Sequence, residues 1–146
     1  MKEYSLDRVE IKLTNPDCIS SKEPIKNVDI AVKLLSEIMI DMDREHFIVI
    51  NLRADLTPIN YSITAIGTLS AVLISPREIL KSSILSNAAS IICIHNHVSG
   101  NLHPSDYDLN AKERLKEAGK IMDIPLTDFI IMGKRSYLSF ANEGYL

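Results

Sequence analysis

Apolar positions recur along the chain with two different periods, which predict helices and strands respectively. In residues 27–42 they recur every three or four positions, and Asn27 is placed to cap the first turn, so we expect an amphipathic helix. Residues 46–52 are rich in β-branched and aromatic side chains and predict a strand. Residues 59–66 predict a second strand, and the short connection at 53–58 predicts a hairpin between them.

The second half of the chain continues this alternation of helices and strands. Ser75, Pro76 and Glu78 predict a helix start, with Ser75 as the cap, Pro76 in the first helical position and Glu78 completing a capping box. That helix is expected to end near residue 86. The later elements are a buried strand at 89–95, a helix from 104–108 to about 122, and closing strands at 126–132 and 137–140.

The order of these elements predicts one domain, residues 1–146, of the α/β (α+β) class. Interleaved strands and helices favour a mixed sheet with helices on its faces. The run Ile91 to Ile94 is apolar on both sides, as expected of a covered central strand. Within residues 1–26, positions 6–13 alternate loosely and are expected to form a strand or extended arm, and positions 15–26 a loop.

Composition and charge narrow the function classes. The chain has 146 residues, of which 46% are hydrophobic and 24% charged, which is typical of a globular protein. Its formal charge of −3 does not support direct nucleic-acid binding through phosphate contacts. No apolar run is long enough to span a membrane and no signal peptide is evident, so we expect a cytoplasmic protein. Cys18 and Cys93 form no CxxC pair, which agrees with reduced thiols.

Two histidines at the end of the buried strand provide the candidate chemistry. His95 and His97 are two positions apart, so their imidazoles share one face of the strand, about 6–7 Å apart at the backbone. Gly100 and Pro104 allow the following loop to fold back and bring Asp108 to the same place. Two histidines and one carboxylate leave a fourth tetrahedral position open, which is typical of a catalytic zinc site.

Other roles for these and nearby residues stay open at this stage. Asp108 is also placed to form a capping box with Ser105, and so to support only a helix start. Cys93 shares the face of the histidines, but between isoleucines we expect a buried apolar residue rather than a nucleophile. His46 is expected to pack or face solvent, and His103 to be a loop residue.

The spaced motif resembles a known family. His95-x-His97, seven residues, Ser105, two residues and Asp108 match the JAMM signature of JAB1/MPN metalloprotease domains. Short flanking segments resemble those of the bacterial RadC family, namely 75–78 (Ser-Pro-Arg-Glu), 87–90 (Asn-Ala-Ala-Ser), 95–100 and 128–131. The resemblance covers about residues 41–146. Val98 replaces a usual proline, and Phe129 stands where a histidine is common. The helix-hairpin-helix region of longer members is not expected in residues 1–40.

The resemblance implies a JAB1/MPN fold, a mixed sheet flanked by helices and similar to cytidine deaminases. It implies that His95, His97 and Asp108 are ligands of Zn²⁺, and that Ser105 hydrogen-bonds the attacking water or the developing oxyanion. It also implies a glutamate general base at the start of an upstream strand, a position that Glu45 matches. Glu78 is the rival, although it already has the expected capping role.

Two functions from different classes follow. The first is a zinc-dependent hydrolase of JAMM type that cleaves an amide in a peptide or isopeptide substrate. The alternative is a non-catalytic, metal-stabilised module that binds DNA or protein. A nuclease is less favoured, because metal-dependent phosphodiesterases commonly use two ions and more carboxylates than this motif supplies. The DNA-repair association of the RadC family comes from resemblance only, and the sequence indicates neither the substrate nor the oligomeric state.

Overall fold

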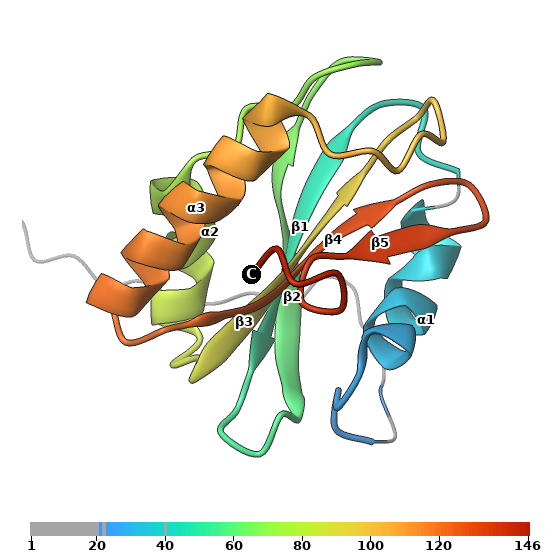
Figure 1. Cartoon of the computed structure of the whole chain (residues 1–146). Helices are drawn as coiled ribbons and strands as arrows, with labels where there is room; N and C mark the ends of the chain where they lie inside the picture. The colour runs from blue at the N-terminus through green and yellow to red at the C-terminus, as the bar shows by residue number, and fades with distance from the viewer. Residues whose placement is uncertain (1–20, 22, 40) are drawn as a thin grey trace, which may run out of the picture.

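The structure, a computed structural model, describes residues 21, 23–39 and 41–146. Its described part contains one five-stranded sheet and three helices (Figure 1). In chain order these are α1 (Val28–Met39), β1 (His46–Leu52), β2 (Pro58–Ile66), α2 (Pro76–Leu85), β3 (Ser90–Asn96), α3 (Asp106–Ile121), β4 (Leu126–Met132) and β5 (Tyr137–Ser139). The predicted mixed sheet with helices on its faces is confirmed. The arm expected at residues 6–13 lies outside the described residues.

The sheet has the strand order β2-β1-β3-β4-β5 and combines both kinds of pairing. β1 runs antiparallel to β2 and to β3, while β3 and β4 are parallel and are joined through α3. β5 returns antiparallel along β4. All seven residues of β3 are buried, so the prediction of a covered central strand is confirmed. Because β3 is central, the residues at its carboxyl end lie among several neighbouring segments.

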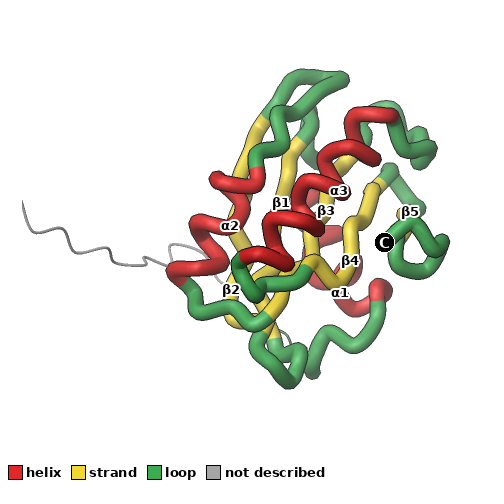
Figure 2. Tube along the Cα trace, turned by 60° about the vertical axis from the view of Figure 1, so that its left-hand side comes forward, coloured by secondary structure: helices red, strands yellow, loops and turns green. Residues whose placement is uncertain are grey.

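The helices cover both faces of the sheet and bury a separate apolar cluster on each (Figures 1 and 2). On one face α2 and α3 pack Ile79 and Leu115 against Phe47 and Phe129. On the other face α1 packs Leu35 against the isoleucines of β1, β3 and β4. Fully burying one such side chain stabilises the fold by about 1.5–3 kcal/mol, so two covered faces make the sheet a rigid support for its loops.

Two of the predicted helix caps are present. The Ile30 N–H donates to Asn27 Oδ1 at 3.1 Å, which places Asn27 as the cap before α1. At α3 the Ser105 hydroxyl accepts from the Asp108 N–H, and the Asp108 carboxylate accepts from the Ser105 N–H. This reciprocal pair is a capping box, and it fixes Asp108 in the first turn of α3.

The capping box expected at α2 is wrong. Ser75 occupies the N-cap position in an extended conformation, but its side chain makes no capping hydrogen bond. Pro76 at the first helical position has no N–H to satisfy, and its ring already sets a helical φ. Arg77 and Glu78 are exposed, so water can accept hydrogen bonds from the remaining backbone N–H groups of this first turn. The start of α2 therefore depends on Pro76 rather than on Glu78.

In the part of the chain that the structure describes, no helix is both long enough and apolar enough to cross a membrane.

Candidate metal centre

The candidate site lies at the carboxyl end of β3, where three other segments meet it. His95 is the sixth residue of β3 and His97 follows the strand, so both imidazoles point to the face that α3 covers. Their ring centroids lie 4.8 Å apart and the ring planes are nearly perpendicular. Glu45 directly precedes β1, in which Phe47 pairs with His95. Asp108 reaches the site from the first turn of α3.

Four side chains converge there. Glu45, His95 and His97 each offer one ligand atom, and these atoms all lie within 4.8 Å of one another. His95 lies between two carboxylates, with Nε2 3.3 Å from Glu45 Oε2 and Nδ1 3.2 Å from Asp108 Oδ1. His97 Nε2 lies 3.5 Å from Asp108 Oδ2. The two histidines can therefore share an ion with either carboxylate.

Burial makes this cluster costly unless its charges are compensated. Glu45, His95 and Asp108 are buried, and the His97 side chain is 13% exposed. Within the described part of the chain, His95 Nδ1 is one of two buried side-chain polar atoms without a hydrogen-bond partner. An unsatisfied buried polar group costs about 1–3 kcal/mol. A cation among these carboxylate oxygens and ring nitrogens would compensate the charges and the unpaired nitrogen together, so the residues present fit a metal ion.

The imidazole of His97 is oriented by the loop that follows it. His97 Nδ1 lies 2.6 Å from the carbonyl oxygen of Asn101, so it is placed to donate its proton there. That assignment leaves a lone pair on Nε2, on the side of Asp108. Gly100 adopts φ +80°, a conformation that favours glycine, and its N–H bonds the carbonyl of His97 in the same turn. The loop thus prepares His97 to act as a ligand through Nε2.

Glu45 is held by its backbone on two sides. Its N–H donates to the Thr68 carbonyl, and its carbonyl accepts from Gly67, each at 2.8 Å. The side chain of Asn96 fixes the residues on either side of Glu45. It accepts from the His46 N–H at 2.6 Å and donates to the Arg44 carbonyl at 3.0 Å. Sequence reasoning missed Asn96, because strand alternation puts its side chain on the face of β3 opposite to the side chains of His95 and His97.

The charges of the site shift the pKa values of its members. Burial acts to lower the pKa of His95, but the close negative charge of Asp108 and the hydrogen bond and charge of Glu45 outweigh it and leave that pKa raised. The hydrogen bond to Asp108 raises the pKa of His97. Burial opposes ionisation of Asp108, yet the close contact with His95 and the hydrogen bonds from His97 and Ser105 together hold its pKa far below the usual range. Asp108 is therefore an anion at neutral pH.

The remaining predicted residues lie around or away from this cluster. The Ser105 hydroxyl donates to Asp108 Oδ2 at 2.6 Å, so it serves its helix and the carboxylate together, and its role toward a substrate stays a prediction. Glu78, exposed on α2, is not part of the cluster. Cys93 is fully buried, which raises its thiol pKa and agrees with the expected packing role. His46 is buried and contacts the Arg44 carbonyl, while His103 is an exposed loop residue as expected.

The fold and site together define a JAB-type α/β domain with a candidate metal centre at the end of its central strand. The model of the RadC-like JAB domain family matches residues 25–145. The chain belongs to this family.

Curated relatives extend the same match. A UPF0758 protein of Shouchella clausii is 38% identical over 136 residues, covering 93% of this chain and 56% of the relative. A UPF0758 protein of Geobacillus sp. is 38% identical, and the match covers 84% of this chain and 54% of the relative. A UPF0758 protein of Chlorobium chlorochromatii is 42% identical, and the match covers 73% of this chain and 48% of the relative. The chain thus spans about half the length of the curated relatives it matches.

Proposed function

We propose that this domain is a zinc-dependent hydrolase of JAMM type that cleaves an amide bond in a peptide or isopeptide substrate. The observation that carries the proposal is the convergence of Glu45, His95 and His97 within 4.8 Å, with Asp108 beside both histidines. Membership of the RadC-like JAB domain family supports the same chemistry.

Three residues are assigned to the ion and a fourth to proton transfer. His95, His97 and Asp108 would hold it, since both histidines face the same carboxylate. When bound, zinc acts as a Lewis acid that makes water a nucleophile near neutral pH. Glu45 would take a proton from the water as its oxygen bonds to the amide carbonyl carbon, and would return that proton to the nitrogen as the C–N bond breaks and the amine leaves.

Glu45 suits proton transfer better than permanent ligation because of how it is held. Its backbone is fixed by Thr68 and Gly67, while its carboxylate contacts the cluster only through His95 Nε2. Asp108, in contrast, is held by its capping box and by both histidines. A carboxylate with one partner can change its protonation state without dismantling the site.

Ser105 is assigned a smaller part. Its hydroxyl already donates to Asp108 Oδ2, so in the resting site it orients that carboxylate. Because the side chain is exposed at the start of α3, the same hydroxyl can turn toward a developing oxyanion.

Metal content and hydrolysis test the proposal in two stages. The purified protein should contain about one zinc per chain by inductively coupled plasma mass spectrometry. The His95→Ala/His97→Ala double variant should lose it, and the matched control His103→Ala should keep it. A native protein without metal would contradict the proposed site.

The second stage separates catalysis from mere metal binding. Glu45→Gln should keep the zinc and lower cleavage of a mixed quenched-fluorescence peptide library by about 10²–10⁴-fold. Glu78→Gln is the control and should leave cleavage unchanged. If wild-type protein with bound zinc and Glu45→Gln behave alike on every peptide, the metal-stabilised binding module is the better function.

A further inference from the structure

The segment that joins β2 to α2 (residues 67–75, the rim segment) runs past the metal centre. At one end, the Glu45 N–H donates to the Thr68 carbonyl at 2.8 Å, so the segment begins beside the proposed base. At the other end, the Ile74 N–H donates at 2.8 Å to the hydroxyl of Tyr107, which lies in the first turn of α3. Figure 1 shows this segment, in green, at the same end of the sheet as the beginning of α3. It therefore connects the two elements that carry the carboxylates of the site.

The rim segment has a fixed conformation. The Thr68 N–H donates to the Ala71 carbonyl at 2.8 Å and closes a turn. A Cβ at Gly67 would lie 2.0 Å from the same carbonyl oxygen, so glycine is needed for this close approach. Val72 and Ile74 are buried in the apolar cluster beneath α2 and α3. The side chains of the rim segment are thus held in place before any ligand binds.

Two leucines of the rim segment are exposed to solvent. Leu69 is 71% and Leu73 is 78% exposed, although the backbone around them is fixed. Leu73 precedes Ile74, whose N–H bonds Tyr107, and Tyr107 is exposed as well. Residues 67–75 contain no charged side chain. An apolar patch that is held in place beside a polar cluster is typical of a surface that binds a ligand.

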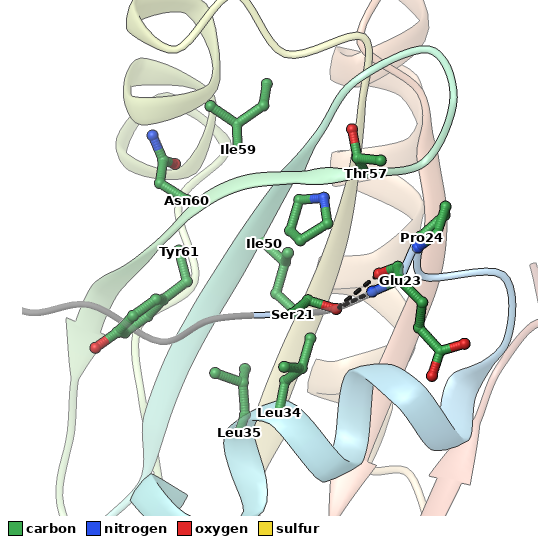
Figure 3. Close-up of a pocket in the computed structure, with 11 residues that line it drawn as sticks. Ser21, Glu23, Pro24, Leu34, Leu35, Ile50, Thr57, Ile59, Asn60 and Tyr61 are labelled. Carbon is green, nitrogen blue, oxygen red and sulfur yellow. Dashed lines mark hydrogen bonds between the residues drawn. The ribbon is translucent and has the colours of Figure 1, made fainter.

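A different candidate for substrate binding is the cavity of about 260 Å³ between α1 and the beginning of β2 (Figure 3). Its apolar wall includes Leu35 and Ile50, which belong to the cluster on the α1 side of the sheet. The imidazoles of His95 and His97 point to the other face. The described residues that line the cavity include no member of the metal cluster. The rim segment, which bonds the backbone of the proposed base, is therefore the better placed of the two.

The reach of Glu45 brings the rim segment next to a bound substrate. To transfer a proton, a carboxylate lies about 2.6–3.2 Å from the reacting group. Neighbouring residues of an extended peptide follow at intervals of about 3.3 Å, so residues one or two positions from the scissile bond lie within about 10 Å of that carboxylate. Thr68 bonds the Glu45 backbone and Leu69 follows it directly. The rim segment is thus within reach of the residues that flank the scissile bond.

We propose that Leu69 and Leu73, together with the ring of Tyr107, bind an apolar side chain of the substrate next to the scissile amide. This inference rests on the proposed function and narrows its substrates to peptides or isopeptides with a large apolar residue within two positions of the cleaved bond. The absence of charge in residues 67–75 favours an apolar occupant over an acidic or basic one. Burying the two exposed leucines against such a side chain provides the binding energy.

Mapping of cleavage sites tests the proposal on the full chain with bound zinc. The peptide library is digested and the products are identified by mass spectrometry, and the wild type should favour a large apolar residue within two positions of the cleaved bond. Leu69→Ala/Leu73→Ala should lower kcat/KM for a favoured peptide by about tenfold or more, mainly by raising KM. Ile121→Ala, at a residue that is 80% exposed at the far end of α3, is the matched control and should behave as the wild type.

A charge at the rim segment gives a result that a purely structural role would not produce. Leu73→Glu should shift the preferred residue near the cleaved bond from leucine to lysine or arginine, since the new carboxylate attracts a cation and repels nothing else in the peptide. Ile121→Glu introduces the same charge at the distant position and should keep the preference for leucine. The urea midpoints of both variants should equal that of the wild type, because both positions are exposed.

The outcomes separate this inference from the proposed function. A wild type with bound zinc that cleaves no peptide overturns both. A wild type that cleaves peptides without a preference for apolar residues overturns only the role of the rim segment. Cleavage by Leu73→Glu with the preference of the wild type also overturns only that role. A preference that changes in Leu73→Glu but not in Ile121→Glu, at equal urea midpoints, supports it.

Discussion

The backbone N–H of His46 donates to the side-chain oxygen of Asn96 at 2.6 Å, across 50 positions of sequence. The same side chain donates to the carbonyl of Arg44, so both neighbours of Glu45 are fixed by one amide. Asn96 itself lies between His95 and His97. One residue therefore links the segment of Glu45, the proposed base, to the end of β3, where the two proposed histidine ligands lie.

Replacing this amide should destabilise the protein more than an ordinary truncation does. Asn96→Ala leaves the buried His46 N–H without its partner and removes one of the two contacts of the Arg44 carbonyl, the other being His46 Nδ1. We therefore expect a loss of about 1–3 kcal/mol in the free energy of unfolding. Urea denaturation measures it. The exposed Asn142, for which no side-chain hydrogen bond is found, is the matched control, and Asn142→Ala should change the free energy by less than about 0.5 kcal/mol. Equal effects of the two variants would contradict the role given to Asn96.

Zinc binding should weaken as the pH falls through the pKa values of the site histidines. Both pKa values are raised by Asp108, so proton competition should begin above the usual value of 6.5. Calorimetric titration with zinc at pH 6 to 8 should show affinity that rises with pH and protons released on binding. His97→Ala should release fewer protons. Affinity that is constant over this range would show that the two histidines do not bind the ion.

Asp128 should make stability depend on pH at the acid end. It is buried and accepts hydrogen bonds from Ser139 Oγ at 2.6 Å and from the N–H groups of Phe129 and Ala141. Burial raises the pKa of Asp128 above its ordinary value of 3.8, so the folded state holds this proton more tightly than the unfolded state. The resulting stabilisation is present below pH 3.8 and is lost as the pH rises through the folded pKa.

Asp128→Asn removes this titration and provides the test. The stability of Asp128→Asn relative to the wild type, measured by urea denaturation, should increase from about pH 3.5 upward and then level off. Asp123→Asn, at an exposed position, should follow the wild type at every pH. Parallel curves for Asp128→Asn and the wild type would show that Asp128 is not a stabilising proton site.

Local patterns predicted the strands and the candidate ligands His95, His97 and Asp108 because each depends on residues that are close in sequence. β1 begins at His46 and ends at Leu52 as the apolar run indicates. His95 and His97 share a face because strand periodicity requires it. Asn96 could not be found in the same way, since its partners Arg44 and His46 come from a strand 50 residues away. Ser75 shows the reverse case: the helix start and its N-cap position are as the sequence predicts, but the expected capping hydrogen bond is absent.

Gly119 provides a test in which helix propensity and packing predict opposite signs. In a helix interior, glycine to alanine is commonly stabilising by about 0.8–1 kcal/mol. At Gly119 of α3, however, an added Cβ would lie 2.5 Å from the carbonyl oxygen of Ile124, a backbone atom that cannot move without shifting the turn into β4. We therefore expect Gly119→Ala to lower the free energy of unfolding by about 1–3 kcal/mol.

The same variant separates the stability of α3 from its role at the site. Asp108 lies at the opposite end of α3, where its capping box is independent of the turn at Ile124. Gly119→Ala should therefore keep its zinc under native conditions while unfolding at lower urea. Lys116→Ala, exposed on the same helix, should match the wild type in both measurements. A stabilised Gly119→Ala would mean that the turn relaxes around the new methyl group and that helix propensity decides the outcome.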